Sequence, residues 1–281
     1  MDAKVDVGRD AELGLARAGV DAANVKFCCA AAYASDWARL LLGDSFHPGG
    51  LTLTERLGAL LGLGPGLRVL DVAAGKGTSA IHLARTFGCA VVGVEYGGDA
   101  VAAATRAAAA AGVAHLTRFE RGDAERLTAP DASFDAVICE CAFCTFPDKR
   151  AAAAELARVL RPGGRVGLSD LTRSGAIPAD LRGLLAWIAC IADAQPLGEY
   201  QRYLTEVGLA VETVEEHDAA LAELVRDIRM KLMGAELLVK LKKVDAPGVD
   251  FEEARTMARA AADAVRAGRF GYALVTATKP G

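Results

Sequence analysis

The sequence predicts an open, doubly wound α/β domain, in which helices cover both faces of a largely parallel sheet. Three observations support this fold class. Short β-branched runs alternate with helical segments from Leu67 onward. A glycine-bearing turn joins the first of these runs to the helix that follows it. The chain has 281 residues, of which 52% are hydrophobic, so it can bury one large core.

The residues ahead of the first strand are expected to form an N-terminal helical cap over 1–62. Apolar residues recur at helical spacing from about Asp21 to Leu42 and again from Leu51 to Leu61. His47, together with Tyr33 and Trp37 on the cap, could border a bound acceptor molecule.

The α/β core is expected over residues 63–216. Its apolar runs are short enough for strands, and they predict strands at Arg68–Val72, Ala90–Glu95, His115–Phe119, Phe134–Cys139, Gly164–Asp170 and Val211–Glu216. Helical segments separate them, including the alanine-rich crossover Ala100–Ala111 and the helices Asp180–Ala194 and Leu197–Val207. The turn Arg161–Gly164 ends a helix before the fifth strand, because proline stops a helix and glycine tolerates positive φ.

Residues 217–281 are expected to be a helical insertion followed by the final strand of the same domain. Two long amphipathic stretches, Ala219–Lys243 and Phe251–Ala267, precede a last β-branched run at Tyr272–Thr278. The insertion would pack near one end of the sheet.

Charge and cysteine usage restrict the possible partners. The formal charge of −4 argues against nucleic acid, because proteins that neutralise many phosphates carry an excess of Lys and Arg. No leader pattern and no membrane-spanning stretch is evident, which favours a cytoplasmic protein. Seven cysteines, several of them clustered, are unlike a secreted disulfide framework and raise the question of soft-metal or metalloid binding.

The first strand-to-helix turn is the candidate nucleotide site. Asp71 is the next-to-last residue of the strand, and Ala73, Gly75 and Gly77 follow the strand. Glycines at this place let the backbone approach a ligand, and the carboxyl ends of the strands form the binding crevice of an open α/β sheet.

Two further carboxylates follow the next strands. Glu95 ends the second strand, where it can accept hydrogen bonds from ribose hydroxyls, and Asp123 follows the third, where it suits an adenine amino group. A nicotinamide-dependent dehydrogenase is the main rival, but its first turn normally reads Gly-x-Gly-x-x-Gly. Here Asp71 precedes Ala73-Ala74-Gly75-Lys76-Gly77 instead.

The segments Val69–Gly77, Gly122–Ala124 and Leu160–Gly164, with Glu95, resemble the class I S-adenosylmethionine-dependent methyltransferases. The resemblance implies a Rossmann-like sheet of about seven strands, the last of them antiparallel, and S-adenosylmethionine as cofactor. Ala73 stands where the family has its first glycine. The implied cofactor-binding residues are Asp71, Ala73, Gly75, Gly77, Glu95, Tyr96, Asp123, Ala124 and Glu140.

Three cysteines lie where the fourth strand ends, beside the expected position of the methyl group. They are Cys139, Cys141 and Cys144, and the first two share a face if the strand persists. A thiolate is a soft ligand, so the cluster favours a soft acceptor such as arsenic(III). The alternative is that cysteine serves here as a small buried hydrophobe.

This segment also resembles the arsenite methyltransferases. Cys141 corresponds to a substrate cysteine that is followed by Pro147–Lys149, and Cys190 with Ile191–Ala194 resembles the second. Cys28 and Cys29 resemble N-terminal cysteines that close over the metalloid. The resemblance implies that Cys141 and Cys190 hold As(III), with Cys28 or Cys29 as the third ligand and Cys144 in reserve. Cys89 is assigned to packing.

These patterns leave three hypotheses open. The first is an As(III) methyltransferase that depends on a thiol reductant such as thioredoxin or glutathione. The second is a methyltransferase for a small, natural-product-like acceptor, with the C-terminal helices as a lid. The third is a noncatalytic metalloid-binding protein, because a fold does not establish a reaction. Asp170, at the end of the fifth strand, could contact substrate in either enzyme.

Overall fold

The computed structural model describes residues 26, 29, 47–177, 181, 190–241 and 250–281. The expected cap helix Asp21–Leu42 lies outside the described residues except for Lys26 and Cys29, both of which are helical. Most of the expected helix Asp180–Ala194 also lies outside them. The second cap helix is present as α4, Gly50–Leu60.

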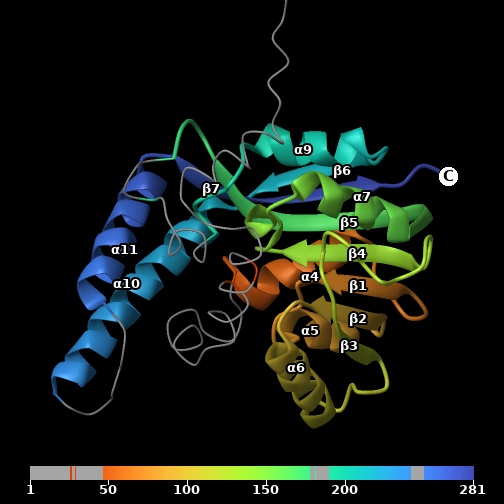
Figure 1. Cartoon of the computed structure of the whole chain (residues 1–281), viewed down its shortest axis with the longest axis horizontal. Helices are drawn as coiled ribbons and strands as arrows, with labels where there is room; N and C mark the ends of the chain where they lie inside the picture. The colour runs from red at the N-terminus through yellow and green to blue at the C-terminus, as the bar shows by residue number, and fades with distance from the viewer. Residues whose placement is uncertain (1–25, 27–28, 30–46, 178–180, 182–189, 242–249) are drawn as a thin grey trace, which may run out of the picture.

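Seven strands form one sheet in the order β3-β2-β1-β4-β5-β7-β6 (Figure 1). Strands β1 to β5 run parallel, and β7 is antiparallel to both β5 and β6, which confirms the predicted fold class. The strands are β1 Arg68–Val72, β2 Ala90–Glu95, β3 Thr117–Arg121, β4 Phe134–Glu140, β5 Leu160–Arg173, β6 Ala210–Glu216 and β7 Phe270–Thr278.

Several strand bounds differ from the prediction by one to four residues, and two of the differences have identifiable reasons. β3 begins at Thr117 rather than His115, because it is the edge strand and has little apolar patterning to define its start. β5 begins at Leu160 and includes the predicted turn, because Gly163 and Gly164 pair with the backbone of Lys279 near the chain end.

Helices cover both faces of the sheet (Figure 1). On one face, α4, α5 (Thr78–Phe87) and α6 (Gly98–Ala110) form a core with alternate strand residues such as Val69 and Val91. On the other face, α7 (Lys149–Val159) and α9 (Leu197–Glu206) pack against Leu70 and Val166. Strands buried on both faces read as continuous apolar runs, which is why the sequence revealed them.

The C-terminal helices α10 (Asp218–Lys240) and α11 (Phe251–Arg266) pack on each other beyond the end of the sheet (Figure 1). Asp250 caps α11 by accepting hydrogen bonds from the backbone N–H groups of Glu252 and Glu253, each at 2.9 Å. A third apolar cluster joins this pair to the sheet through Phe270 and Tyr272. It also contains Cys144 and Cys190.

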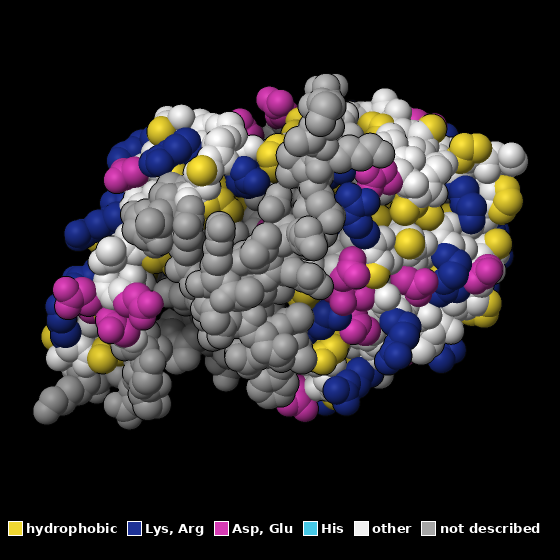
Figure 2. All heavy atoms as spheres, turned by 45° about the horizontal axis from the view of Figure 1, so that its top comes forward, with side chains coloured by type: hydrophobic (Ala, Val, Ile, Leu, Met, Phe, Trp, Pro, Cys, Tyr) yellow, Lys and Arg dark blue, Asp and Glu magenta, His cyan; other side chains and the backbone are white. Residues whose placement is uncertain are grey.

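Charged side chains of both signs are interspersed over the face seen in Figure 2. Among the described residues of that face they do not gather into one basic patch, in keeping with the acidic balance of the chain. Among the described residues, none of the helices has the length and apolar character needed to cross a membrane.

Candidate active site

The turn after β1 forms the floor of a pocket at the carboxyl ends of the strands. Ala73, Gly75 and Gly77 all have positive φ, at 60°, 54° and 79°. A Cβ atom on Gly77 would lie 2.7 Å from the Phe119 ring, so only glycine lets this turn pack so closely. Ala73 adopts a conformation that costs an L-residue about 1–2 kcal/mol.

Three carboxylates from different strands face this pocket: Asp71, Glu95 and Glu140. Asp71 is 2% exposed, and its Oδ2 atom has no hydrogen-bond partner among the described residues. Burial and the nearby charges of Glu140 and Glu95 raise the pKa of Asp71 well above its ordinary value. A buried Asp71 oxygen without a hydrogen-bond partner, close to two other carboxylates, favours a cationic ligand that carries N–H donors.

Glu95 holds the turn in place. Its two carboxylate oxygens accept hydrogen bonds from the backbone N–H groups of Gly75 and Gly97, each at 2.9 Å. A carboxylate offers about four acceptor positions, so Glu95 retains capacity for ligand hydroxyls. Tyr96 and Ala124 also line the pocket.

Asp123 lies at the other side of the pocket, where Lys26 reaches it. The Lys26 ammonium is 2.9 Å from Asp123 Oδ2 and also pairs with Glu125. Burial lowers the pKa of Lys26, but the hydrogen bonds to Glu125 and Asp123 outweigh it, so the pKa is raised. Sequence reasoning did not find Lys26, because a single lysine in the cap carries no signal of its distant partner.

A cluster of three polar side chains, His47, Thr54 and Glu140, is buried between α4 and the end of β4. His47 Nε2 is 3.2 Å from Thr54 Oγ1 and 3.6 Å from Glu140 Oε2. Thr54 donates a hydrogen bond of 3.0 Å to Glu140. His47 was expected to border the acceptor and does line the pocket, whereas Thr54 was missed because it sits in an ordinary amphipathic helix.

The cysteines after β4 separate into two environments. β4 ends at Glu140, and Cys141 has a φ of 50°, so the strand does not persist and Cys139 and Cys141 do not share a face. Cys139 is fully buried in the core beneath α7 and α9. Cys141 instead lines the pocket, with Cys29 also among the lining residues.

Three thiols lie close together beside this end of the pocket. Cys141 Sγ lies 3.8 Å from Cys190 Sγ, and Cys144 and Cys190 lie in one buried apolar cluster against which Cys141 packs. The expected helix does not reach Ala194, because Cys190 has a φ of 61° and the residues after it form turns. Cys28 lies outside the described residues, and Cys89 is buried beneath α4 and α5, as its assignment to packing requires.

Burial and neighbouring groups raise the pKa values of the Cys141 and Cys144 thiols. The hydrogen bond to Cys190, burial and the charge of Asp170 raise the pKa of Cys141 well above its ordinary value. Burial and the hydrogen bond to Cys190 do the same for Cys144. Asp170 is itself buried, and this burial, with the nearby Cys190, raises its pKa to about 7.

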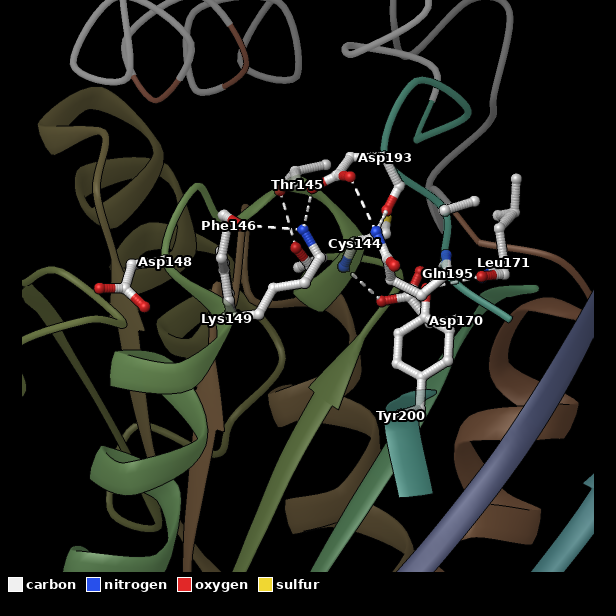
Figure 3. Close-up of polar contacts among 12 residues, drawn as sticks. Cys144, Thr145, Phe146, Asp148, Lys149, Asp170, Leu171, Asp193, Gln195 and Tyr200 are labelled. Carbon is white, nitrogen blue, oxygen red and sulfur yellow. Dashed lines mark hydrogen bonds and ion pairs between the residues drawn. The ribbon is translucent and has the colours of Figure 1, made fainter. Parts of the chain in front are cut away.

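Asp170 lies beneath the thiols rather than on the pocket wall. Its carboxylate accepts hydrogen bonds from the backbone N–H groups of Cys144 and Leu171, each at 2.8 Å (Figure 3). Within the described part of the chain, no group of three or more His, Cys, Asp or Glu side chains is arranged to hold a metal ion.

Comparison with known proteins identifies the family. Residues 69–164 match the family described as methyltransferase domain. Over 240 residues, the chain is 33% identical to 27-O-demethylrifamycin SV methyltransferase of Amycolatopsis mediterranei, covering 81% of this chain and 83% of the relative. The chain belongs to the class I S-adenosylmethionine-dependent methyltransferases. This methyltransferase is also 27% identical to methyltransferase GfsG of Streptomyces halstedii, over 84% of its own length and 83% of the relative.

Solved structures share the fold. A putative sarcosine dimethylglycine methyltransferase from Galdieria sulphuraria matches with a TM-score of 0.75 and 20% identity, over 89% of this chain and 98% of that one. The [4+2]-cyclase SpnF matches with a TM-score of 0.66 and 23% identity, over 82% and 80%.

Membership of this family makes the chain an enzyme with S-adenosylmethionine as its cofactor. The pocket suits that molecule, because a sulfonium and an ammonium group both complement Asp71, Glu95 and Glu140. The dehydrogenase and noncatalytic hypotheses are thereby set aside. The resemblance to arsenite methyltransferases gains no support from these matches.

Proposed function

We propose that this methyltransferase transfers a methyl group to trivalent arsenic held by protein thiols. One observation carries the proposal: Cys141 lines the cofactor pocket and lies 3.8 Å from Cys190, which shares a buried apolar cluster with Cys144. Packing alone does not require three thiols from two separate segments, two of them buried, to converge beside a reactive site, although each is an acceptable small hydrophobe.

The proposal also gives each predicted residue of the cofactor pocket a role in binding S-adenosylmethionine. Bound S-adenosylmethionine supplies an electrophilic methyl group on a positively charged sulfur. Asp71 and Glu140 would offset cationic charge, Glu95 would accept from the ribose, and Asp123 would accept from the adenine. The turn containing Ala73, Gly75 and Gly77 gives the close backbone approach, and Tyr96 and Ala124 form walls.

Protonated thiols are compatible with arsenic loading. When arsenous acid condenses with a thiol, the As–O bond breaks, an As–S bond forms, and the thiol proton leaves with the oxygen as water. No net proton is released, so the raised pKa values of Cys141 and Cys144 are no obstacle. A divalent metal ion would instead require thiolates and would release protons on binding. The tris-thiolate arsenic complex is neutral and therefore suits a buried cluster.

The chain's role in the transfer would be to orient the acceptor and exclude water. An arsenic lone pair carries no proton, so no general base is required. Cys141 and Cys190 would hold the arsenic, with Cys144 or Cys29 as the third ligand, so that its lone pair faces the cofactor. A thiol reductant of the thioredoxin or glutathione class would keep the cysteines reduced.

Transfer of a labelled methyl group tests the proposal. The enzyme is incubated with methyl-labelled cofactor and arsenite, beside a panel of small organic acceptors, in the presence of glutathione. We expect label in arsenic species, and we expect Cys141→Ser to abolish it while the cofactor affinity measured by calorimetry stays nearly unchanged. Cys139→Ala, in the core, is the matched control and should retain transfer. Retained transfer to arsenic in Cys141→Ser would contradict the proposal.

A small organic acceptor with a hydroxyl group is the second candidate. Two observations favour it: the similarity to 27-O-demethylrifamycin SV methyltransferase, and the His47–Glu140 pair facing the pocket. An imidazole paired with a carboxylate can accept the proton of a hydroxyl during methylation. This candidate predicts label in an organic product only, with loss of transfer in His47→Gln and retention in Cys141→Ser.

A further inference from the structure

A buried lysine at the start of α7 pairs with a carboxylate from a distant segment. The Lys149 side chain is 2% exposed, forms an ion pair with Asp193, and donates a hydrogen bond of 2.9 Å to the carbonyl of Phe146. Figure 3 shows its ammonium group reaching toward both. Lys149 ends the Pro147–Lys149 motif, for which the sequence offered no physical role.

The ion pair joins the two segments that carry the clustered thiols. Lys149 follows Cys141 and Cys144 on the segment between β4 and α7. Asp193 follows Cys190 on the segment that leads into α9. A change in the distance between Lys149 and Asp193 would therefore move Cys190 relative to Cys141.

The segment from 190 to 195 has no helical or strand ladder of its own, and apart from one backbone bridge between Gln195 and Thr172 on β5, side-chain bonds hold it in position. Gln195 Nε2 donates to Asp193 Oδ1 at 2.8 Å, and Arg173 Nε donates to the Ala194 carbonyl at 2.7 Å. Cys190 itself has a left-handed backbone, which persists only where the surroundings enforce it.

Stability alone is a weak reason to bury this ion pair. Removing each charge from water costs several kcal/mol, and apolar residues of similar size often stabilise a protein as well or better. Lysine is also among the residues least often fully buried. The buried ion pair is better explained by a geometric role, which an apolar contact could not supply.

We propose that the Lys149–Asp193 ion pair is a positioning device that holds the Cys190 thiol beside Cys141, so that one arsenic atom can bond to both. The inference rests on the proposed function, since it assigns the pair a purpose in arsenic binding. Lys149 and Asp193 act through Cys190 and do not touch the acceptor.

Phenylarsine oxide tests the thiol geometry without any methyl transfer. Its arsenic condenses with two thiols, forming two As–S bonds and releasing one water. We expect tight binding to the full-length enzyme, lost in Cys141→Ser and in Cys190→Ser. Lys149→Met should weaken binding at least about tenfold, because small misplacements of paired groups have effects of this size. Lys149→Arg should recover part of the loss, and the cofactor affinity should stay unchanged.

The double variant Lys149→Met/Asp193→Asn separates positioning from folding, since it leaves no unpaired buried charge. We expect it to regain thermal stability but to keep the weakened binding of phenylarsine oxide. The matched control is Arg158→Met on the same helix, which breaks ion pairs with Glu155 and Asp131 remote from the thiols. It should lower stability and leave phenylarsine oxide affinity unchanged.

Several outcomes would overturn the inference. They are wild-type affinity in Lys149→Met, full recovery of binding in the double variant, or an equal loss of binding in Arg158→Met. If the wild type binds phenylarsine oxide and the variants behave as expected, the positioning role holds even when arsenite is not methylated. In that case only the proposed function fails.

Discussion

Single residues beside the pocket adopt backbone conformations that L-amino acids rarely use. Ala73, Cys141 and Cys190 all have positive φ, and each such residue costs about 1–2 kcal/mol. The sequence made the first of these predictable, because Ala73 stands in a turn where the family has glycine. It gave no signal for the two cysteines, whose conformations depend on contacts with distant segments.

Ala73→Gly tests the strain directly. Glycine adopts the left-handed region without the Cβ clash, so we expect the free energy of unfolding to rise by about 1 kcal/mol. Ala132→Gly is the matched control, because Ala132 has a φ of 48° in an exposed loop away from the pocket, and it should give a similar gain. Urea denaturation measures both. A lower stability for Ala73→Gly would show that the turn is not strained.

The raised pKa of Asp170 predicts a pH-dependent stability. Its folded pKa of about 7 exceeds the ordinary value of 3.8, so the folded state binds the proton more tightly than the unfolded state. The stabilising contribution is therefore complete below the unfolded pKa and is lost as the pH rises through the folded pKa.

Between pH 5 and pH 8, the free energy of unfolding of the wild type should fall more steeply than that of Asp170→Asn. The variant will be less stable overall, because one amide oxygen cannot replace a carboxylate that accepts from both Cys144 and Leu171. Urea titrations at each pH measure the slope. Equal slopes in the two proteins would contradict the assigned pKa.

Elements that are buried on both faces were predicted well from sequence, and those defined by tertiary contacts were not. β1, β2 and β4 read as apolar runs between turns, and their observed bounds follow those runs. The exposed edge strand β3 was placed two residues early, because its pattern is weak. The turns after Cys190 were predicted as helix, since their local composition is compatible with one and only distant partners forbid it.

The short η1 helix, Phe143–Thr145, presents Cys144 and depends on α9 for support. Tyr200 on α9 donates a hydrogen bond of 2.6 Å to the Leu171 carbonyl, and its ring packs on Phe143. Tyr200→Phe leaves that buried carbonyl with one bond fewer, so we expect a loss of about 1–3 kcal/mol in unfolding free energy.

Tyr203→Phe is the matched control for this element. Tyr203 also packs on Phe143, but its hydroxyl forms no hydrogen bond with any described residue. We expect a change within about 0.5 kcal/mol, as for substitutions away from special contacts. Chemical denaturation compares the two variants. Equal losses in both would show that the Tyr200 hydrogen bond contributes nothing specific.

At the scale of the whole molecule, the sheet order brings the donor and acceptor sites together. β1 and β4 are neighbours, so the cofactor turn after β1 and the thiol segment after β4 open onto one pocket. Sequence reasoning could predict this juxtaposition, because the carboxyl ends of parallel strands share one edge. The approach of Cys190, from beyond β5, to Cys141 was expected only from the resemblance to arsenite methyltransferases, since no local pattern encodes it.

We predict that arsenic in this pocket bonds to sulfur alone. X-ray absorption at the arsenic edge, on wild-type enzyme loaded with one equivalent of arsenite, measures the identity and number of its bonded neighbours. We predict about three sulfur neighbours and no oxygen, with one sulfur replaced in Cys141→Ser. An arsenic atom surrounded by oxygen, or one whose neighbours are the same in Cys141→Ser as in the wild type, would contradict arsenic binding by these thiols.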